Sequence, residues 1–236
     1  CELAQTFCRF GSKVTLIELA PSILGREDRD AAAILQETLI REGVDLQLGV
    51  KISAVESRGN RKVLQLEQKG QVREVSVDQI LVGVGRAPNT EGLALQAAGV
   101  EFDRSGIKVN DRLQTTNANI YAAGDVCSAY KFTHMADAQA RILLANALFM
   151  GRQRSSNLIV PWCTYTDPEI AHVGMYEQDA IARGISVTTV SIPLSDVDRA
   201  VLDGETEGFA RVHLHKGTDR ILGATIVARH AGEMIN

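Results

Sequence analysis

The first 48 residues constrain the fold most, because their apolar positions follow helical and strand periodicity in turn. Leu3, Phe7 and Phe10 recur at helical spacing and predict a helix over residues 1–10. The same reasoning predicts a β-branched strand, a long helix and a second strand over residues 13–18, 27–42 and 44–48. Helices that alternate with strands through short loops are typical of a parallel α/β sheet. We therefore expect the chain to open with part of such a sheet.

The next segment has the pattern of a small antiparallel excursion. Short strands are expected over residues 50–55, 63–68 and 72–75. Gly59-Asn60 and Lys69-Gly70 separate them and predict hairpin turns. Residues 79–84, QILVGV, are almost entirely apolar and predict a buried central strand. The glycines at its end would let a backbone pass close to a flat cofactor, although tight strand packing explains them equally well.

Residues 115–126, TTNANIYAAGDV, carry the most informative local pattern. Residues 120–123 predict a small buried strand that delivers Gly124 and Asp125 to a loop. In open α/β sheets ligands bind at the carboxyl ends of strands, so Asp125 is a candidate ligand for sugar hydroxyls. A plain Gly-Asp turn is the alternative. A helix is predicted over 133–151, and its amino end would carry a partial positive charge beside this loop. A short helix is also expected over 91–98, and a strand over 107–109.

The last third has a different character. The polar run QRSSN, residues 153–157, predicts a domain boundary. Beyond it we expect four strands and one helix, over residues 162–166, 187–193, 209–215, 220–228 and, for the helix, 176–183. The turn KGTD predicts a hairpin between the last two strands. Strands grouped with one helix indicate an α+β domain. His213 and His215 share a strand face but lack a third ligand, so we expect no metal site.

Composition narrows the choice of partners and compartment. The net charge of −4 and the 45% hydrophobic content predict a globular protein that binds neither nucleic acid nor an anionic membrane. None of the four cysteines lies in a CxxC pair or a zinc-binding spacing, so free, buried thiols and a reducing cytoplasm are expected. The chain starts at Cys1 and stops within AGEMIN, and we expect it to be an internal piece of a longer protein.

Glu18 is the candidate for recognising a dinucleotide. It ends the strand KVTLIE, where an acid in a dinucleotide-binding fold accepts hydrogen bonds from the adenosine ribose. A carboxylate there repels a 2′-phosphate, so NAD(H) is favoured over NADP(H). The glycine-rich loop belongs about 20 residues upstream, which would place it before Cys1. A solvated glutamate at a strand end is the alternative.

Four segments in order resemble one family. ILVGVGRAPN, TTNANIYAAGDV, TYTDPEIAHVGM and GTDRILGATIVARHAGEMI together resemble the flavin-dependent pyridine nucleotide–disulfide oxidoreductases. SDVDRAVLDGETEGFARVH is most similar to mercuric reductase-like members, and the GEMI ending is equally similar to dihydrolipoamide dehydrogenase. The resemblance implies an α/β fold with partial Rossmann-like domains followed by an α+β dimerisation domain. The implied parts are an NAD(P)H-binding domain without its first strand and glycine loop, a second FAD-binding segment and an incomplete dimerisation domain, over residues 1–85, 86–157 and 158–236.

The resemblance also implies site residues and chemistry. Glu2 resembles a catalytic glutamate near the nicotinamide, and Asp125 an FAD ribityl ligand. The other implied cofactor-binding residues are Glu18, Ile52, Gly85, Lys131, Phe132, Thr133, His134 and Ala136. The redox pair Cys-x4-Cys and the His-Glu dyad of the family are not among the residues of this chain. We expect a homodimer formed through 158–236 that passes hydride from NAD(P)H through FAD to a disulfide, a small molecule or a thiolate-bound metal ion. The alternative is a fragment that only binds nucleotide or dimerises.

Overall fold

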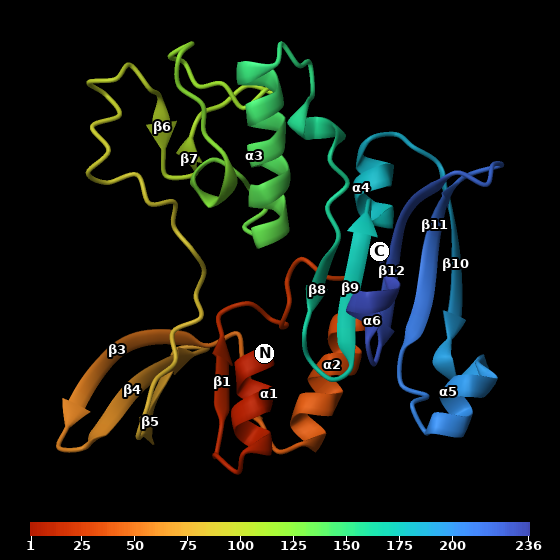
Figure 1. The fold of residues 1–236 in the computed structure, drawn as a ribbon. Helices are drawn as coiled ribbons and strands as arrows, with labels where there is room; N and C mark the ends of the chain where they lie inside the picture. The colour runs from red at the N-terminus through yellow and green to blue at the C-terminus, as the bar shows by residue number, and fades with distance from the viewer. The chain divides into compact units, whose positions relative to one another are not determined.

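A computed structural model describes residues 1–236, and the chain divides into two compact units. Unit 1 comprises Cys1–Leu81 and Pro161–Asn236, and unit 2 comprises Val82–Val160. Figure 1 labels their helices and strands. None of the helices is both long and apolar enough to cross a membrane.

Unit 1 begins with the predicted α/β alternation. Its elements are α1, β1, α2 and β2, at Glu2–Arg9, Thr15–Glu18, Arg29–Arg41 and Asp45–Leu48. β1 and β2 pair in parallel, with Thr15 opposite Asp45. Gly11 and Gly43 follow the two helices with φ of 90° and 100°, a conformation that glycine adopts without a steric penalty. The predicted fold class is therefore confirmed in this segment.

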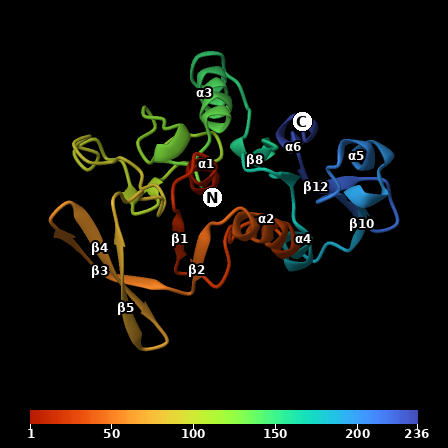
Figure 2. The same ribbon diagram turned by 90° about the horizontal axis from the view of Figure 1, so that it is seen from below.

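A three-stranded antiparallel sheet follows. It consists of β3, β4 and β5, at Lys51–Arg58, Arg61–Gln68 and Gln71–Val77, in that order. The turns contain Gly59 at φ 62° and Lys69-Gly70 at φ 51° and 78°, so both predicted hairpins are confirmed. The strands are longer than the sequence predicts because the ladders continue through exposed polar residues. Figure 2 shows this sheet beside β1 and β2.

The second segment of unit 1 is built on a five-stranded antiparallel sheet in the order β10-β11-β12-β9-β8. In chain order its elements are β8 Trp162–Thr164, β9 Glu169–Gly174, α4 Glu177–Ala182, β10 Val187–Pro193, η3 Leu194–Asp196, α5 Asp198–Asp203, β11 Phe209–His215, β12 Ile221–Ala228 and α6 Ala231–Met234. The expected hairpin joins β11 to β12. β9 and α5 were not predicted. β9 escapes the strand pattern because His172, a polar residue, is fully buried in it.

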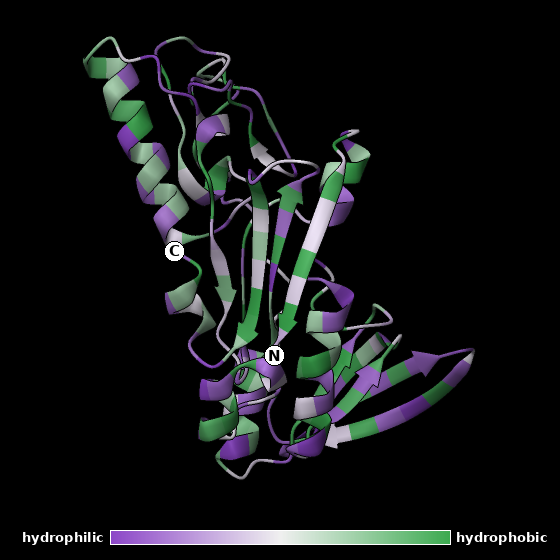
Figure 3. Cartoon of the chain, turned by 90° about the vertical axis from the view of Figure 1, so that its right-hand side faces the viewer, coloured by the Kyte–Doolittle hydropathy of each residue, from purple (hydrophilic) through white to green (hydrophobic).

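One hydrophobic core is shared by the two segments of unit 1. It contains Leu35 and Leu39 of α2 together with Ile170, Phe209 and Val227 of the five-stranded sheet. Figure 2 shows α2 between β2 and α4. Figure 3 shows hydrophobic residues alternating with paler and polar ones along several strands, as expected of a sheet whose faces differ in environment. α2 therefore links residues 1–81 to residues 161–236.

Unit 2 has little regular structure apart from one long helix. Its elements are β6 Phe102–Asp103, β7 Gly106–Ile107, the 3₁₀ turn η1 Gly124–Val126, α3 Thr133–Leu148 and the 3₁₀ turn η2 Ser155–Asn157. A small core of Leu95, Val100, Ile107 and Ala122 holds its loops together. α3 confirms the predicted helix, although it ends three residues before the predicted end.

The expected central strand at 79–84 was wrong. These residues form no strand, and the side chains of Val82 and Val84 are 75% and 90% exposed. A wholly apolar strand is typical of the interior of a parallel sheet whose two faces are both covered. The parallel sheet of this structure contains only β1 and β2, so the segment has no such place to occupy.

Three smaller predictions in unit 2 also need correction. Residues 91–98 form turns instead of a helix, because Gly92 and Ala94 have φ of 75° and 49° and interrupt helical geometry. The strand expected at 107–109 begins one residue earlier and ends two residues earlier, as β7. Residues 120–123 are not a strand: Tyr121 makes one isolated bridge, and the backbone hydrogen bond from Ala122 N to Leu113 O closes a loop.

Candidate functional site

The turn η1 is shaped by a glycine that lies against the first turns of α3. Gly124 has φ of 79°, and a Cβ atom placed on it would lie 3.1 Å from the Cβ atom of Ala136. A side chain at this position would therefore be both strained and crowded. The glycine lets the chain turn close to α3 and present Asp125 next to the helix start.

Asp125 is only weakly engaged within the chain. Its side chain is 46% exposed, and its Oδ2 atom lies 3.4 Å from Nη1 of Arg86. A pair of exposed charges at this distance contributes little to stability. The carboxylate thus remains accessible as a hydrogen-bond acceptor for a ligand hydroxyl.

Lys131 is directed at the backbone of the same loop. Its Nζ donates hydrogen bonds to the carbonyl oxygens of Asp125 at 2.7 Å and Ser128 at 3.2 Å. The ammonium group therefore fixes the loop that follows η1. Contact of Lys131 with a cofactor stays a prediction, and it would have to use the backbone or the remaining donor of the side chain.

The predicted flavin segment continues into the start of α3. The rings of Phe132 and His134 stack with their centroids 5.4 Å apart, and Thr133 and His134 are exposed in the first turn. No side chain caps this helix. Its first N–H groups, with the positive end of the helix dipole, can therefore face an electron-rich ligand edge. Asp137 of α3 pairs with Arg141, one turn further along the helix.

Gln139 is a residue that sequence reasoning missed. Its side chain is 97% buried, as only 3% of its surface is exposed. Its Oε1 atom accepts a hydrogen bond from the N–H of Gly124 at 2.7 Å, and its Nε2 atom lies 3.4 Å from the Oγ atom of Ser155. The sequence did carry a signal for its burial. Gln139 lies four residues after Met135 and three before Ile142, and this helical spacing places all three on the buried face of α3.

On the predicted dinucleotide side, Glu18 ends β1 as expected. Its Oε1 atom accepts the N–H of Ala20 at 2.8 Å, so one carboxylate oxygen shapes the turn. Val50 N donates to the Glu18 carbonyl at 3.1 Å and brings the beginning of β3 alongside. Ile52 lies two residues further on, with 43% of its side chain exposed. The structure thus brings Glu18 and Ile52 to the same edge of unit 1.

The arginines near this edge differ in their contacts. Arg29 donates to the Oγ atom of Ser22 and to the carbonyl oxygens of Leu24 and Glu27, the last at 2.7 Å. Its guanidinium group therefore holds the loop between β1 and α2 and is not directed at a phosphate. Arg26 is exposed.

The remaining predicted residues lie in different settings. Glu2 begins α1, and its Oε1 atom accepts the N–H of Tyr165 at 2.7 Å within unit 1. Gly85 belongs to unit 2, has φ of 113° and has no heavy atom within 4 Å of a hypothetical Cβ. That open backbone is compatible with the close approach of a flat ligand.

The cysteines and the other residue types that can bind metals form no additional site. All four cysteines are free and partly buried. Burial raises the pKa of the Cys127 thiol to about 11 and that of Cys163 to about 12, so both stay protonated near neutral pH. No group of three or more His, Cys, Asp or Glu side chains is placed to hold a metal ion.

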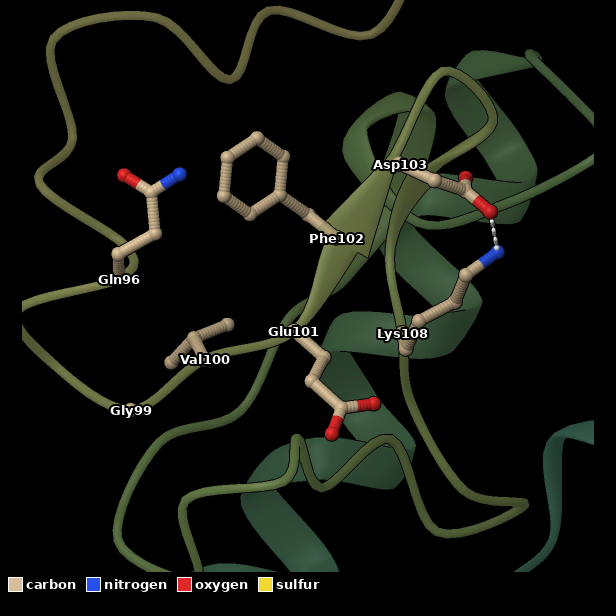
Figure 4. Close-up of a pocket in the computed structure, with 7 residues that line it drawn as sticks. All are labelled: Gln96, Gly99, Val100, Glu101, Phe102, Asp103 and Lys108. Carbon is tan, nitrogen blue, oxygen red and sulfur yellow. Dashed lines mark ion pairs between the residues drawn. The ribbon is translucent and has the colours of Figure 1, made fainter.

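A hollow of about 770 Å³ lies elsewhere in unit 2. Figure 4 shows Phe102 and Gln96 on one side and the ion pair of Lys108 with Asp103 on the other. The hydrogen bond from Lys108 is the main reason why the pKa of the Asp103 carboxyl lies well below its usual value. None of the predicted site residues lines this hollow.

Comparison with known proteins agrees with this geometry. Residues 1–140 match the pyridine nucleotide-disulphide oxidoreductase family and residues 160–236 match its dimerisation domain. The chain is 37% identical to a mercuric reductase of Staphylococcus aureus over 99% of this chain and 43% of the relative. It is 40% identical to a dihydrolipoyl dehydrogenase of Thermus scotoductus over 99% of this chain and 51% of the relative.

A solved structure extends the agreement to three dimensions. The HOCl-induced flavoprotein disulfide reductase of Escherichia coli superposes with a TM-score of 0.86 at 32% identity, over 99% of this chain and 53% of that protein. The chain spans about half the length of the relatives that it matches. The resemblance read from the four sequence motifs is confirmed. The chain belongs to the pyridine nucleotide-disulphide oxidoreductase family, whose members are flavin enzymes that bind FAD and NAD(P)H.

Proposed function

We propose that this chain is part of an FAD-dependent enzyme that passes hydride from NAD(P)H through flavin to a disulfide or a thiolate-bound acceptor. The observation that carries the proposal is the Gly124-Asp125 turn at the uncapped start of α3. A mercuric reductase-like activity is the first candidate, because of the segment that spans α5 and the start of β11. Dihydrolipoyl dehydrogenase activity is the alternative, supported by the 40% identity to such an enzyme.

The residues of the turn fit a flavin dinucleotide. Gly124 leaves room for a backbone approach, and the accessible carboxylate of Asp125 would accept hydrogen bonds from ribityl hydroxyls. The start of α3 would place N–H donors and a partial positive charge beside the pyrimidine edge of the ring system, which stabilises the negative charge of the reduced ring. When bound, FAD supplies the two-electron redox chemistry, and the chain supplies binding and orientation.

The dinucleotide edge supports NAD(H) as the preferred reductant. Glu18 would hold the adenosine ribose hydroxyls and repel a 2′-phosphate. Arg29, the arginine that follows in α2, is engaged by the carbonyl groups of its own loop. Glu2 and Gly85 would lie near the nicotinamide, and Ile52 near the adenine, as the family resemblance implies.

The intact protein would act as a homodimer. The match of residues 160–236 to the family's dimerisation domain supports this assembly. The four free thiols are consistent with our placing the protein in a reducing cytoplasm. The proposed boundaries remain 1–85, 86–157 and 158–236 for the three family domains.

The acceptor is tested with the purified full-length flavoenzyme. We expect NADH oxidation to be stimulated more by thiol-complexed Hg²⁺ than by lipoamide at equal concentration, measured by loss of NADH absorbance. Faster turnover with lipoamide would identify the alternative. A protein that contains no FAD would contradict the whole proposal.

The 236-residue chain alone should be inactive and should not retain FAD in stoichiometric amounts. About half of each relative lies outside the part that it matches. Flavin absorbance at near-unit occupancy in the isolated chain would contradict this expectation. A chain that binds nucleotide without any turnover would agree with the alternative of a binding or dimerisation module.

Glu18 provides a test of coenzyme choice. In the full-length enzyme, Glu18→Ala should lower kcat/KM for NADH about tenfold relative to that for NADPH, an effect of ~1.4 kcal/mol. Glu18→Gln keeps an acceptor for Ala20 N–H but removes the charge, so it should relax the preference without disturbing the turn. Asp45→Asn, at the opposite end of the β1–β2 pair, serves as the matched control. Equal losses with both coenzymes would show that Glu18 does not recognise the 2′-position.

A further inference from the structure

We propose that Gln139 is a positioning residue of the flavin site, which sets the place of Asp125 by holding the residue before it. This inference rests on the proposed function, since it concerns the same site. It assigns a role to Gln139, a buried residue that is not among the predicted site residues. Gln139 itself would not touch the flavin, because its carboxamide is occupied by the protein.

The carboxamide of Gln139 is attached at both ends. The N–H of Gly124 requires an acceptor, which fixes Oε1 on that side at 2.7 Å. Nε2 then faces the Oγ atom of Ser155 at 3.4 Å. With only 3% of its surface exposed, the side chain cannot exchange these contacts for solvent without movement of α3 or the turn. Gln139 therefore connects Gly124, α3 and η2.

Gly124 determines the course of the whole turn. Its carbonyl oxygen accepts hydrogen bonds from Cys127 N at 3.1 Å and Ser128 N at 2.9 Å. Its N–H is buried and depends on Gln139. Loss of the Gln139 acceptor would leave a buried donor unsatisfied, which a chain relieves by shifting toward water or another acceptor. Asp125 is the next residue, so its carboxylate would move with the turn.

A second contact holds Asp125 from its other side. Lys131 donates to the Asp125 carbonyl at 2.7 Å. The backbone around Asp125 is thus held on the amino side through Gly124 and Gln139, and on the carboxyl side through Lys131. Its carboxylate, by contrast, has only the weak contact with Arg86. This arrangement fixes the backbone and leaves the functional group accessible.

The test compares FAD binding by full-length apoprotein variants. Gln139→Asn shortens the side chain so that it no longer reaches Gly124, and Gln139→Met keeps the buried volume without an acceptor. Both should raise the FAD dissociation constant about tenfold, the usual effect of losing one buried hydrogen bond. Gln139→Glu keeps an acceptor for Gly124 and can accept from Ser155, so its dissociation constant should stay within about threefold of wild type.

Asn146 offers a matched control. It lies two turns further along α3, where its carboxamide makes two 2.9 Å hydrogen bonds to the backbone of Gln153. Asn146→Ala should therefore change the FAD dissociation constant less than about twofold. Melting temperatures of the apoproteins separate a general loss of stability from a loss specific to FAD.

A double-mutant cycle decides whether Gln139 acts through Asp125. In the Asp125→Asn background, Gln139→Met should weaken FAD binding less than about twofold further, because the group that it positions has already been altered. A full tenfold loss in that background would overturn the inference. So would unchanged FAD affinity in both Gln139→Asn and Gln139→Met, or an effect equal to that of Asn146→Ala.

The outcomes separate this inference from the proposed function. Wild-type apoprotein that binds no FAD would refute the proposed function. If wild type binds FAD and Asp125→Asn weakens it while the Gln139 variants do not, only the role of Gln139 fails. A lowered apoprotein melting temperature with unchanged FAD affinity would show that Gln139 is merely structural.

Discussion

The two proposed cofactor-binding regions of this chain are held in different ways. The flavin-side turn at Gly124 is fixed by residues close in sequence, since Lys131 and Gln139 lie six and fifteen positions from their partners. The loop after Glu18, on the proposed dinucleotide side, is held by Arg29 nearby and, in addition, by residues more than 130 positions away. Glu27 in that loop accepts hydrogen bonds from Trp162 Nε1 at 2.9 Å and Tyr176 OH at 2.6 Å.

The Glu27 contact is a buried polar junction between the two segments of unit 1. Glu27 is 8% exposed, and its carboxylate meets two neutral donors. Burial, followed by the charge of Glu27, raises the pKa of the Tyr176 hydroxyl, which stays a donor. The Tyr176 ring stacks on His172 with centroids 3.6 Å apart. Because each group satisfies another, removal of one would leave buried polar atoms unpaired.

Arg211 makes a second junction nearby. Its guanidinium group pairs with Asp28 at 3.1 Å and with Asp30, and it lies 4.2 Å from the ring centre of Phe209. The Arg211 side chain is 16% exposed, so these contacts are partly shielded from solvent. The pKa of Asp30 is lowered chiefly by its hydrogen bond with Arg211. The start of α2 is thereby attached to the five-stranded sheet.

This difference indicates what each region depends on. The flavin-side turn requires mainly that α3 and its own loop form. The dinucleotide-side loop requires in addition that the distant five-stranded sheet is folded against α2. We therefore expect a defect in the shared core of unit 1 to affect the dinucleotide edge and the dimerisation segment together.

The largest effect that would test this comparison is expected from Leu35→Ala. Leu35 is fully buried in the core shared by α2 and the five-stranded sheet. The cavity should cost about 4 kcal/mol of unfolding free energy. In the full-length protein, hydrogen exchange should accelerate together in β1, β2, β11 and β12, and not in α3.

Leu95→Ala in the small core of unit 2 is the matched control for this substitution. It should accelerate exchange in unit 2 and leave the five-stranded sheet unchanged. If Leu35→Ala affected residues 1–81 but not 161–236, the shared core would not couple the two segments, and the comparison would fail.

A smaller effect is expected from the buried histidine at the Glu27 junction. Desolvation lowers the pKa of His172 to about 4, and nearby His213 acts in the same direction, whereas the hydrogen bond with the Gly174 carbonyl and the charge of Asp179 oppose the shift. The unfolded chain takes up this proton below pH ~6.5 and the folded chain only near pH 4. Stability therefore falls as pH decreases through that window, by ~2–3 kcal/mol.

His172→Asn should remove much of this dependence while keeping a polar group for Thr225, which bonds His172 Nδ1 at 2.8 Å. Urea unfolding of both proteins at pH 7 and pH 4.5 measures the difference. The pKa of His213 is lowered in the same direction by burial, so a residual slope is expected in the variant. Identical pH dependence in wild type and variant would contradict the assignment.

The smallest effect is expected from a surface ion pair between the same two segments of unit 1. Arg41 and Glu207 pair across the two segments at 2.6 Å, but their side chains are 57% and 54% exposed. Solvent screens such a pair, so Arg41→Gln should change the free energy of unfolding far less than Leu35→Ala. Thermal melting at low and high salt provides the measurement. A loss as large as that of Leu35→Ala would show that surface charge, not the buried core, joins the segments.

Local sequence patterns predicted the elements whose partners lie nearby. The hairpins at Gly59 and Gly70, the helices α1, α2 and α3, and the β11–β12 hairpin follow from turn residues and periodicity. The strand predicted at 79–84 did not form. An apolar pattern predicts that a strand is buried, but its burial depends on other parts of the sheet, which the pattern does not specify. β9 was missed for the opposite reason, since its buried polar residue, His172, is paired with Thr225 of a distant strand.

The candidate site shows the same difference between features that depend on nearby residues and features that depend on distant ones. The sequence by itself determined the family and the candidate residues, because motifs such as YAAGD are local and need no partner to be recognised. Only the tertiary structure decided that Lys131 holds the Asp125 backbone, that Gln139 supports Gly124 and that Glu27 attaches the loop after Glu18 to the distant sheet. The physical reason is that hydrogen bonds and burial depend on distances in space, and spacing along the chain predicts them only when both partners belong to one element or turn.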